Sequence, residues 1–147
     1  MMSSPFGQAV PLRASSVIVV HTLVFNAAGE LLLLRRANTG FMDGHYALPG
    51  GHRQTSEEIV TAAVRECREE ARVEVADIKP IVVMPYDGGV DFIFEAMRWS
   101  GTPGIGEPDK CDDLLFALPD ALPSPTVTFV AAALECRARG VWFRELH

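Results

Sequence analysis

A chain of 147 residues, 48% apolar and 22% charged, is long enough to bury a core and has the composition of a soluble globular domain. Its formal net charge of −6 argues against binding along nucleic-acid backbones, which requires a basic surface, so no nucleic-acid polymer is expected as a partner. The N-terminal residues lack the pattern of a signal peptide, no apolar run is long enough for a membrane span, and three cysteines without a CxxC pair indicate a reduced, cytoplasmic setting.

The first half of the chain predicts two strands joined by a turn, which together suggest a β-hairpin. Residues 15–25 are β-branched and apolar, as is typical of a buried strand, and residues 31–36 form a second apolar run. Gly, Asn and Asp concentrate over residues 37–45 and indicate a loop. Residues 46–52 then predict a short strand that enters a tight turn.

Two helices are expected, one in the middle of the chain and one near its end. Thr55 is a suitable N-cap for the first helix, and Glu58, three residues later, completes the pattern of a capping box. Ser124 followed by Pro125 predicts the start of the second helix. That helix should stop at Gly140.

Three more strands are predicted between the helices, over residues 78–86, 90–99 and 111–118. Several strands combined with two helices predict a mixed α/β fold. We expect residues 1–14 to be an N-terminal lead-in and residues 15–147 to form one domain.

Three acids of the first predicted helix project from the same side. Glu66, Glu69 and Glu70 are spaced i, i+3 and i+4. The side expected to pack on the sheet carries Val60, Val64, Cys67 and Ala71. A charge run of this kind is usually a solvated surface.

Three features favour a bound cation over a solvated acidic face. No lysine follows the acids as an i+4 partner, and a Gly-Gly turn before the helix allows a ligand to approach the backbone closely. The acids also lie toward the helix C-terminus, where the macrodipole disfavours negative charge. Because carboxylate oxygens suit Mg²⁺ and Mn²⁺, the pattern predicts a divalent metal site that also takes substrate phosphates.

This stretch resembles the signature of the Nudix hydrolases, which is Gly, five residues, Glu, seven residues, then R-E-U-x-E-E-x-G-U with U aliphatic. The matching positions are Gly51, Glu57, Arg65, Glu66, Cys67, Glu69, Glu70 and Val73. Arg72 stands in place of the last glycine, Ser56 in place of a glycine that often precedes the first Glu, and Gln54 in place of a common Glu. A left-handed Arg72 would cost about 1 kcal/mol relative to glycine.

The resemblance implies a Nudix-type α/β/α sandwich with a mixed β-sheet. It also implies hydrolysis of a nucleoside diphosphate linked to another group, with Mg²⁺ or Mn²⁺ as cofactor. Arg65 is expected to orient an acid, Glu57 or a neighbour, and not to touch the metal. The groups expected at the metal are the carbonyl of Gly50 and the carboxylates of Glu66, Glu69 and Glu70.

An acid from outside the motif usually completes such a site, and Glu107 is the best candidate because it lies on a loop after a strand, as in small family members. Its competitors are Asp109, Asp112 and Asp113. The acid that activates the attacking water is expected to be Glu66 or Glu107.

Candidates for substrate contact lie just before the motif. Arg35 and Arg36 end a predicted strand, and one of them is expected to contact phosphate, since neighbouring residues of a strand face opposite ways. Phe41 and Tyr46 are candidates for stacking on a base, with burial in the core as the alternative. His21, within an apolar strand, is expected to be structural.

The leading functional hypothesis is a metal-dependent pyrophosphatase that converts a nucleoside triphosphate to a nucleoside monophosphate and pyrophosphate. Within the same enzyme class, the alternative substrate is a nucleotide sugar or a dinucleotide polyphosphate. Outside that class, the chain would be a catalytically inactive nucleotide-binding module or an acidic scaffold protein. The expected partner is a small nucleotide, and a homodimer is compatible with the family resemblance.

Overall fold

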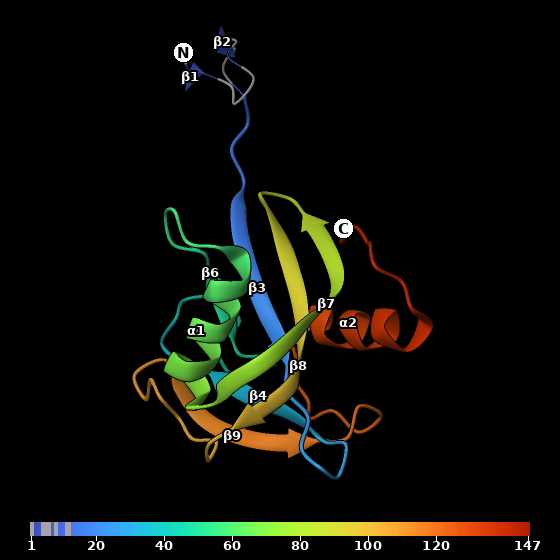
Figure 1. The fold of residues 1–147 in the computed structure, drawn as a ribbon. Helices are drawn as coiled ribbons and strands as arrows, with labels where there is room; N and C mark the ends of the chain where they lie inside the picture. Colours follow the sequence, from blue (N-terminus) through green and yellow to red (C-terminus); the bar gives the residue numbers. More distant parts are fainter. Residues whose placement is uncertain (1, 4–6, 8, 11–12) are drawn as a thin grey trace.

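The computed structural model describes residues 2–3, 7, 9–10 and 13–147 (Figure 1). Its strands are β1 (Met2–Ser3), β2 (Ala9–Val10), β3 (Val17–Leu23), β4 (Leu31–Arg36), β5 (Tyr46–Ala47), β6 (Gly50–His52), β7 (Glu74–Tyr86), β8 (Gly89–Ser100) and β9 (Cys111–Ala117). Its helices are α1 (Ile59–Ala71) and α2 (Thr128–Arg139). The lead-in predicted for residues 1–14 falls partly outside the described residues, and the domain boundary at residue 15 stays a prediction.

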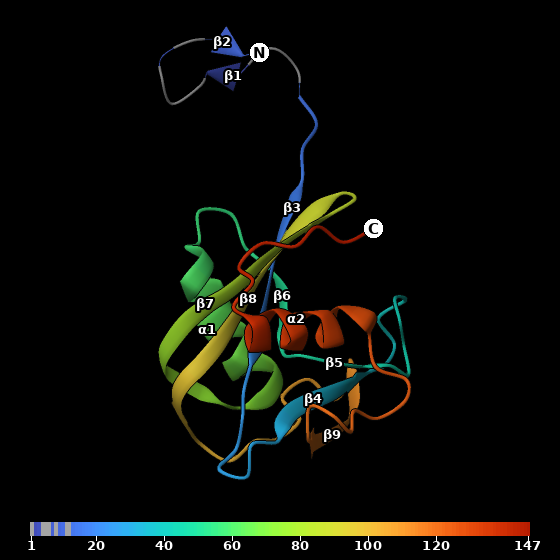
Figure 2. The same cartoon turned by 90° about the vertical axis from the view of Figure 1, so that its right-hand side faces the viewer.

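Two sheets form the centre of the fold. One has the strand order β6-β3-β8-β7 and the other the order β5-β4-β9. Strand β3 runs parallel to β8 and antiparallel to β6, so the larger sheet is mixed. Helices α1 and α2 lie on opposite sides of this sheet (Figures 1 and 2). The predicted mixed α/β sandwich is therefore confirmed.

The predicted hairpin is present only next to the turn, because β3 and β4 then separate into different sheets. Beside the turn, Phe25 and Leu31 form an antiparallel bridge, and the Leu32 amide donates to the Val24 carbonyl at 2.9 Å. The consecutive leucines of β4 explain the separation, since they bury both of its faces. Leu33 packs in the core cluster under α2, whereas Leu32 packs with Cys67 of α1. A strand buried on both faces needs a layer on each side.

Helix α1 begins later than the predicted capping box places it. Its N-cap is Glu58, in an extended conformation and without a side-chain cap hydrogen bond. Ser56 has a left-handed backbone with φ of 64°, and the Glu57 amide donates to the Gln54 carbonyl at 3.2 Å. A tight turn therefore occupies the residues where Thr55 was expected to start the helix.

Helix α2 also begins later than predicted, at Thr128 instead of Pro125, although it ends at Gly140 as expected. The preceding residues are held extended by a bridge to β5. The Tyr46 amide donates to the Pro125 carbonyl at 3.0 Å, and the Val127 amide donates to the Tyr46 carbonyl at 2.9 Å. Because these backbone groups already form hydrogen bonds with β5, they are not available for hydrogen bonds within α2.

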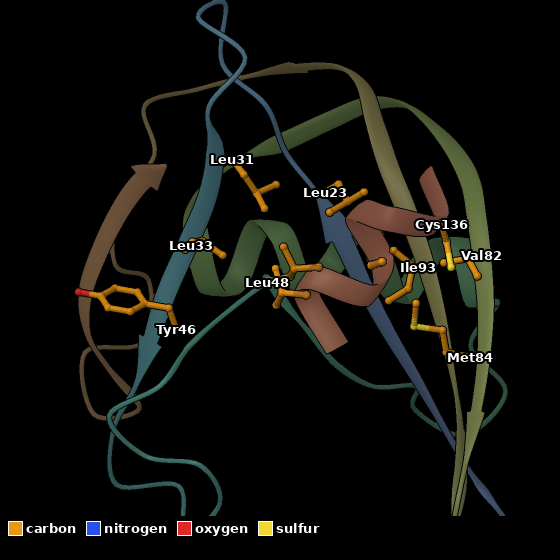
Figure 3. Packing of buried hydrophobic residues seen from close by; sticks show 11 residues of the cluster. Leu23, Leu31, Leu33, Tyr46, Leu48, Val82, Met84, Ile93 and Cys136 are labelled. Carbon is orange, nitrogen blue, oxygen red and sulfur yellow. The ribbon is translucent and has the colours of Figure 1, made fainter. Parts of the chain in front are cut away.

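The core under α2 is the larger one, and its side chains converge from both sheets (Figure 3). On the other side of the larger sheet, Ala62 and Ala63 of α1 pack against Val20 and Phe94. Val60, predicted to face the sheet, is 45% exposed. The helix is turned so that small alanines approach the sheet, and this rotation also brings acidic side chains inward.

No helix within the described ranges is long and apolar enough to cross a membrane.

Candidate functional site

The turn at Gly50 and Gly51 lets carboxylates of α1 approach the backbone of β6. The Gly50 amide donates a hydrogen bond to Oε2 of Glu70 at 3.0 Å. A Cβ on Gly51 would lie only 2.8 Å from Oε1 of Glu66, so a larger residue there would push this carboxylate away. Gly51 is thus required for the close contact between β6 and α1.

Arg65 is the centre of the acidic cluster, and its side chain is 16% exposed. Its Nε donates to Glu57 at 2.7 Å, and its Nη2 donates to the same carboxylate at 3.1 Å. Its Nη1 donates to Glu66 and to Glu69, each at 3.0 Å. The hydrogen bonds from Arg65 lower the pKa of Glu57, and the acids in turn raise the pKa of Arg65. Arg65 therefore ties the turn before α1 to the acids on the helix.

Glu66 and Glu70 are carboxylates in a confined, poorly hydrated environment. Burial raises the pKa of Glu70 to about 8, and the nearby carboxylates of Glu66 and Glu107 act in the same direction, opposed by the Gly50 amide. Burial also raises the pKa of Glu66, although Arg65 opposes this shift. Charged groups in such a place cost stability unless an opposite charge compensates them.

The loop after β8 docks on the C-terminal end of α1 and carries Glu107 to the cluster. The Gly104 amide donates to the Ala71 carbonyl at 3.0 Å, and the Gly106 amide donates to the Glu70 carbonyl at 2.9 Å. These bonds satisfy carbonyls that have no partner within the helix. Glu107 follows directly, near enough to Glu70 to influence its pKa.

The competing acids have other partners or lie elsewhere. Asp112 accepts a 2.7 Å hydrogen bond from Nε of Arg35, and Asp113 accepts one from the Tyr46 hydroxyl. Asp109 is exposed. Of the acids considered after β8, the structure brings Glu107 next to Glu70.

The four candidates for substrate contact form two cation–π pairs. Arg35 lies over the ring of Tyr46 at 5.7 Å, and Arg36 lies over the ring of Phe41 at 5.5 Å. Tyr46 is 7% exposed and belongs to the core, as its alternative interpretation proposed, whereas Phe41 is 65% exposed. The Arg36 Nε also donates to the Phe41 carbonyl at 2.7 Å, which fixes the loop after β4.

Sequence reasoning missed the part played by Gly104 and Gly106. The signal was present as two glycines spaced i, i+2 directly before Glu107, in a segment interpreted only as a loop. A Cβ on Gly106 would overlap the Glu69 carbonyl oxygen, so only glycine fits this contact without movement.

The carboxylates have the chemistry that a divalent cation requires, but Arg65 holds two of them, Glu66 and Glu69. Within the described part of the chain, no three His, Cys, Asp or Glu side chains are grouped closely enough to hold a metal ion. Two of the acids are engaged by Arg65, and one of these, Glu69, is exposed enough to turn away. Glu66 is buried and Glu70 is half-buried, and compensation of their charges is the chemistry of a hard-metal site.

Comparison with known proteins gives the family. A sequence model of the NUDIX domain matches residues 15–134. The 8-oxo-dGDP phosphatase NUDT18 of Danio rerio is 32% identical over 94 residues, which are 63% of this chain and 29% of that protein. The chain thus spans less than a third of the length of this relative.

Solved structures share the fold. A MutT NUDIX hydrolase from Burkholderia pseudomallei has a TM-score of 0.76 and 26% identity, over 82% of this chain and 97% of that one. A NUDIX hydrolase from Nitrosomonas europaea has a TM-score of 0.71 and 21% identity, over 97% of this chain and 84% of that one. Because the family model matches most of the chain, this chain belongs to the NUDIX domain family.

Proposed function

We propose that this NUDIX hydrolase converts a nucleoside triphosphate to a nucleoside monophosphate and pyrophosphate with the help of a divalent metal. Hydrolysis of nucleoside diphosphate-X compounds is the activity of the family, and the triphosphate is the specific proposal. One observation carries it: the buried carboxylate of Glu66 and the half-buried carboxylate of Glu70 lie against the turn at Gly50 and Gly51, and the docked loop brings Glu107 near Glu70.

The metal would be held by the Gly50 carbonyl and the carboxylates of Glu66, Glu69, Glu70 and Glu107. Mg²⁺ or Mn²⁺ fits because both prefer oxygen ligands and keep positions for phosphate oxygens. When bound, the metal reduces the repulsion between an anionic pyrophosphate and its nucleophile. The release of Glu69 from Arg65 would complete this ligand set.

The protein side chains have separate tasks in this proposal. Glu66 or Glu107 takes the proton from the attacking water, since both lie at the cluster and a carboxylate can act as a general base. Arg65 holds Glu57 and the helix in place without touching the metal. Arg36 is the better candidate for phosphate contact, because Arg35 is paired with the Asp112 carboxylate, whereas Arg36 donates to uncharged oxygens of Phe41 and Thr39.

The experiment is a panel of nucleoside triphosphates, diphosphates, nucleotide sugars and dinucleotide polyphosphates, each assayed with Mg²⁺ and with Mn²⁺. Products are separated so that pyrophosphate is distinguished from orthophosphate. Release of pyrophosphate from a triphosphate is expected. Cleavage confined to other substrates would contradict the proposal, and binding without cleavage would favour the inactive nucleotide-binding module.

A nucleoside diphosphate is the second candidate substrate, because the relative from Danio rerio is named as a phosphatase of 8-oxo-dGDP. Such a substrate would give a nucleoside monophosphate and orthophosphate. Including oxidised and unoxidised guanine di- and triphosphates in the panel decides between the two substrates. A cytoplasmic location and a homodimer stay predictions of the sequence.

A further inference from the structure

A polar pair lies beneath the glycine turn, on the side of the larger sheet that faces α2. His21 of β3 donates from Nδ1 to both oxygens of Asp91 on β8, at 2.8 Å and 3.0 Å. The two side chains are 12% and 7% exposed. The His21 ring also packs on Phe129 of α2, with ring centroids 4.5 Å apart. The ring is therefore held from two directions.

Stability alone does not account for this pair. A buried polar pair is seldom more stabilising than apolar side chains of the same size, because its desolvation offsets its attraction. The surrounding residues of the face, such as Leu23 and Ile93, are apolar and fully buried. What the pair adds over a hydrophobic contact is a single fixed orientation of the imidazole ring.

The fixed ring lies against Gly50. His21 and Gly50 are direct partners in the pairing of β3 with β6. A Cβ on Gly50 would overlap the Val20 carbonyl oxygen and Cδ2 of the His21 ring, at 2.1 Å and 2.4 Å, so the backbone of β3 and the imidazole together fill the space that a side chain would take. The Gly50 amide meanwhile holds Glu70 at 3.0 Å. Gly50 is thus confined by the β3 backbone, by the imidazole on the same side, and by the carboxylate that accepts its amide hydrogen bond.

We propose that His21 and Asp91 are positioning residues, which hold the Gly50 peptide in the orientation that the metal site requires. The inference rests on the proposed function for its metal-binding consequence. With the ring in place, the Gly50 amide stays on Glu70, and its carbonyl stays available as a ligand. Without the ring, the two-glycine turn gains the space and the backbone freedom to move away from α1. The pair thus acts through Gly50 and does not itself contact substrate.

The first experiment measures Mn²⁺ affinity by calorimetric titration in three variants. His21→Ala should bind Mn²⁺ about 10- to 100-fold more weakly than the wild type, the range typical for losing a partner that orients a ligand. Asp91→Asn keeps an acceptor for Nδ1 and should stay within about threefold of the wild type. Val82→Ala is the matched control, because it removes buried volume from β7, away from β6. It should leave the affinity unchanged.

The second experiment needs no metal. Amide hydrogen exchange at Gly50 in metal-free protein should accelerate at least about tenfold in His21→Ala, beyond any change shown by slowly exchanging core amides. Val82→Ala should accelerate exchange at the Gly50 amide no more than it accelerates exchange at the slowly exchanging core amides. If His21→Ala does not fold, His21→Phe keeps the ring volume and removes the bond to Asp91. Faster Gly50 exchange and weaker Mn²⁺ binding are then expected in that variant.

Two failures are distinguishable. If the wild type binds no Mn²⁺, the proposed function falls, while Gly50 exchange still tests the positioning role. If the wild type binds Mn²⁺ and a folded His21 variant binds it within threefold with unchanged Gly50 exchange, the positioning role is overturned. The kinetic signature expected from the role is a fall in kcat with less than about a threefold change in KM for the nucleotide, since no substrate contact is removed.

Discussion

Arg72 ends α1 in the left-handed region, with φ of 58° and ψ of 32°. The Arg72 amide donates to the Arg68 carbonyl at 3.1 Å, which is the bond of the αL C-cap motif, and the Val73 amide donates back to the Cys67 carbonyl at 3.2 Å. Ser56, the other position where the family often has glycine, is also left-handed. At both positions the backbone keeps the conformation suited to glycine although the side chain has changed.

Arg72→Gly is therefore expected to stabilise the protein by about 1 kcal/mol, through relief of left-handed strain. Loss of a cation near the helix C-terminus opposes this by less than about 1 kcal/mol at an exposed position. Arg72→Ala is the matched control, because it removes the charge and keeps the strain. Urea titration of the three proteins measures the effect. A glycine variant no more stable than the alanine variant would contradict the strain argument.

Glu107→Gln is expected to reduce turnover about a hundredfold or more, because the amide can neither accept a proton nor balance a metal charge. Substrate binding should survive, since the acids of α1 remain. Asp109→Asn, an exposed acid two residues later, is the control and should stay within about twofold of the wild type. Steady-state kinetics on the preferred nucleotide decides. Near-normal turnover in Glu107→Gln would move the role to Asp112 or Asp113.

The docked loop is the element that joins Glu107 to the helix acids, and its two glycines make a matched test. A Cβ on Gly106 would overlap the backbone oxygen of Glu69, whereas a Cβ on Gly104 would lie 3.4 Å from the flexible side chain of Arg72. Gly106→Ala should cost about 1–3 kcal/mol of unfolding free energy and also lower activity by displacing Glu107. Gly104→Ala should be close to neutral. Equal unfolding free energies in denaturant titration would show that the loop does not depend on this contact.

The elements themselves were largely predictable from the sequence, because their signals are local. The β-branched runs marked the long strands, and Gly140 marked the end of α2. The error at β3 and β4 has a different origin. Two apolar strands joined by a short turn favour a hairpin locally, but the four buried leucines of β4 require a layer on each side. The pairing of β4 is decided by this tertiary packing. The packing involves residues that are distant in the sequence, so a short stretch of sequence does not reveal it.

The site was predictable in part for the same reason. The motif spacing placed Glu66 and Glu70 on one helix, and the loop position of Glu107 suggested its proximity. What the sequence could not show is the rotation of α1, which exposes Val60 and turns Glu66 toward the Gly51 backbone. That rotation depends on the small side chains that meet the sheet. Nor could it show that His21 and Asp91 meet, since 70 residues separate them in the chain.

Over the whole molecule, the two edges of the larger sheet are used differently. The edge of β7 is covered by the C-terminal segment, in which the Arg144 amide donates to the Val83 carbonyl at 3.0 Å and the Leu146 amide to the Pro85 carbonyl at 2.8 Å. At the other edge, β6 directs the Gly50 amide to a carboxylate instead of another strand. The C-terminal segment thus protects the β7 edge from pairing with other chains, and the β6 edge forms part of the acidic site.

The cost of that acidic site to the whole molecule gives the last prediction. Glu70→Gln keeps the size of the side chain and an oxygen for the Gly50 amide. Because the pKa of Glu70 is raised to about 8, the substitution removes one charge from the cluster with Glu66 and Glu107 only above that pH, so the melts are run above pH 8. Without metal, the variant should melt at or slightly above the temperature of the wild type, since each like-charge pair at helical spacing costs roughly 0.2–0.5 kcal/mol. Its hydrolytic activity should fall by orders of magnitude.

Metal should reverse the order of stability, because a ligand that binds only the folded state stabilises it by mass action. With Mg²⁺, the melting temperature of the wild type should rise, and that of Glu70→Gln should rise less. Glu58→Gln, an exposed acid at the start of α1, is the control and should respond as the wild type does. Thermal melts of the three proteins with Mg²⁺ and with chelator, beside a turnover assay, measure both effects. A solvated acidic face would give equal shifts and equal activity in all three, because no cation would then depend on the charge of Glu70.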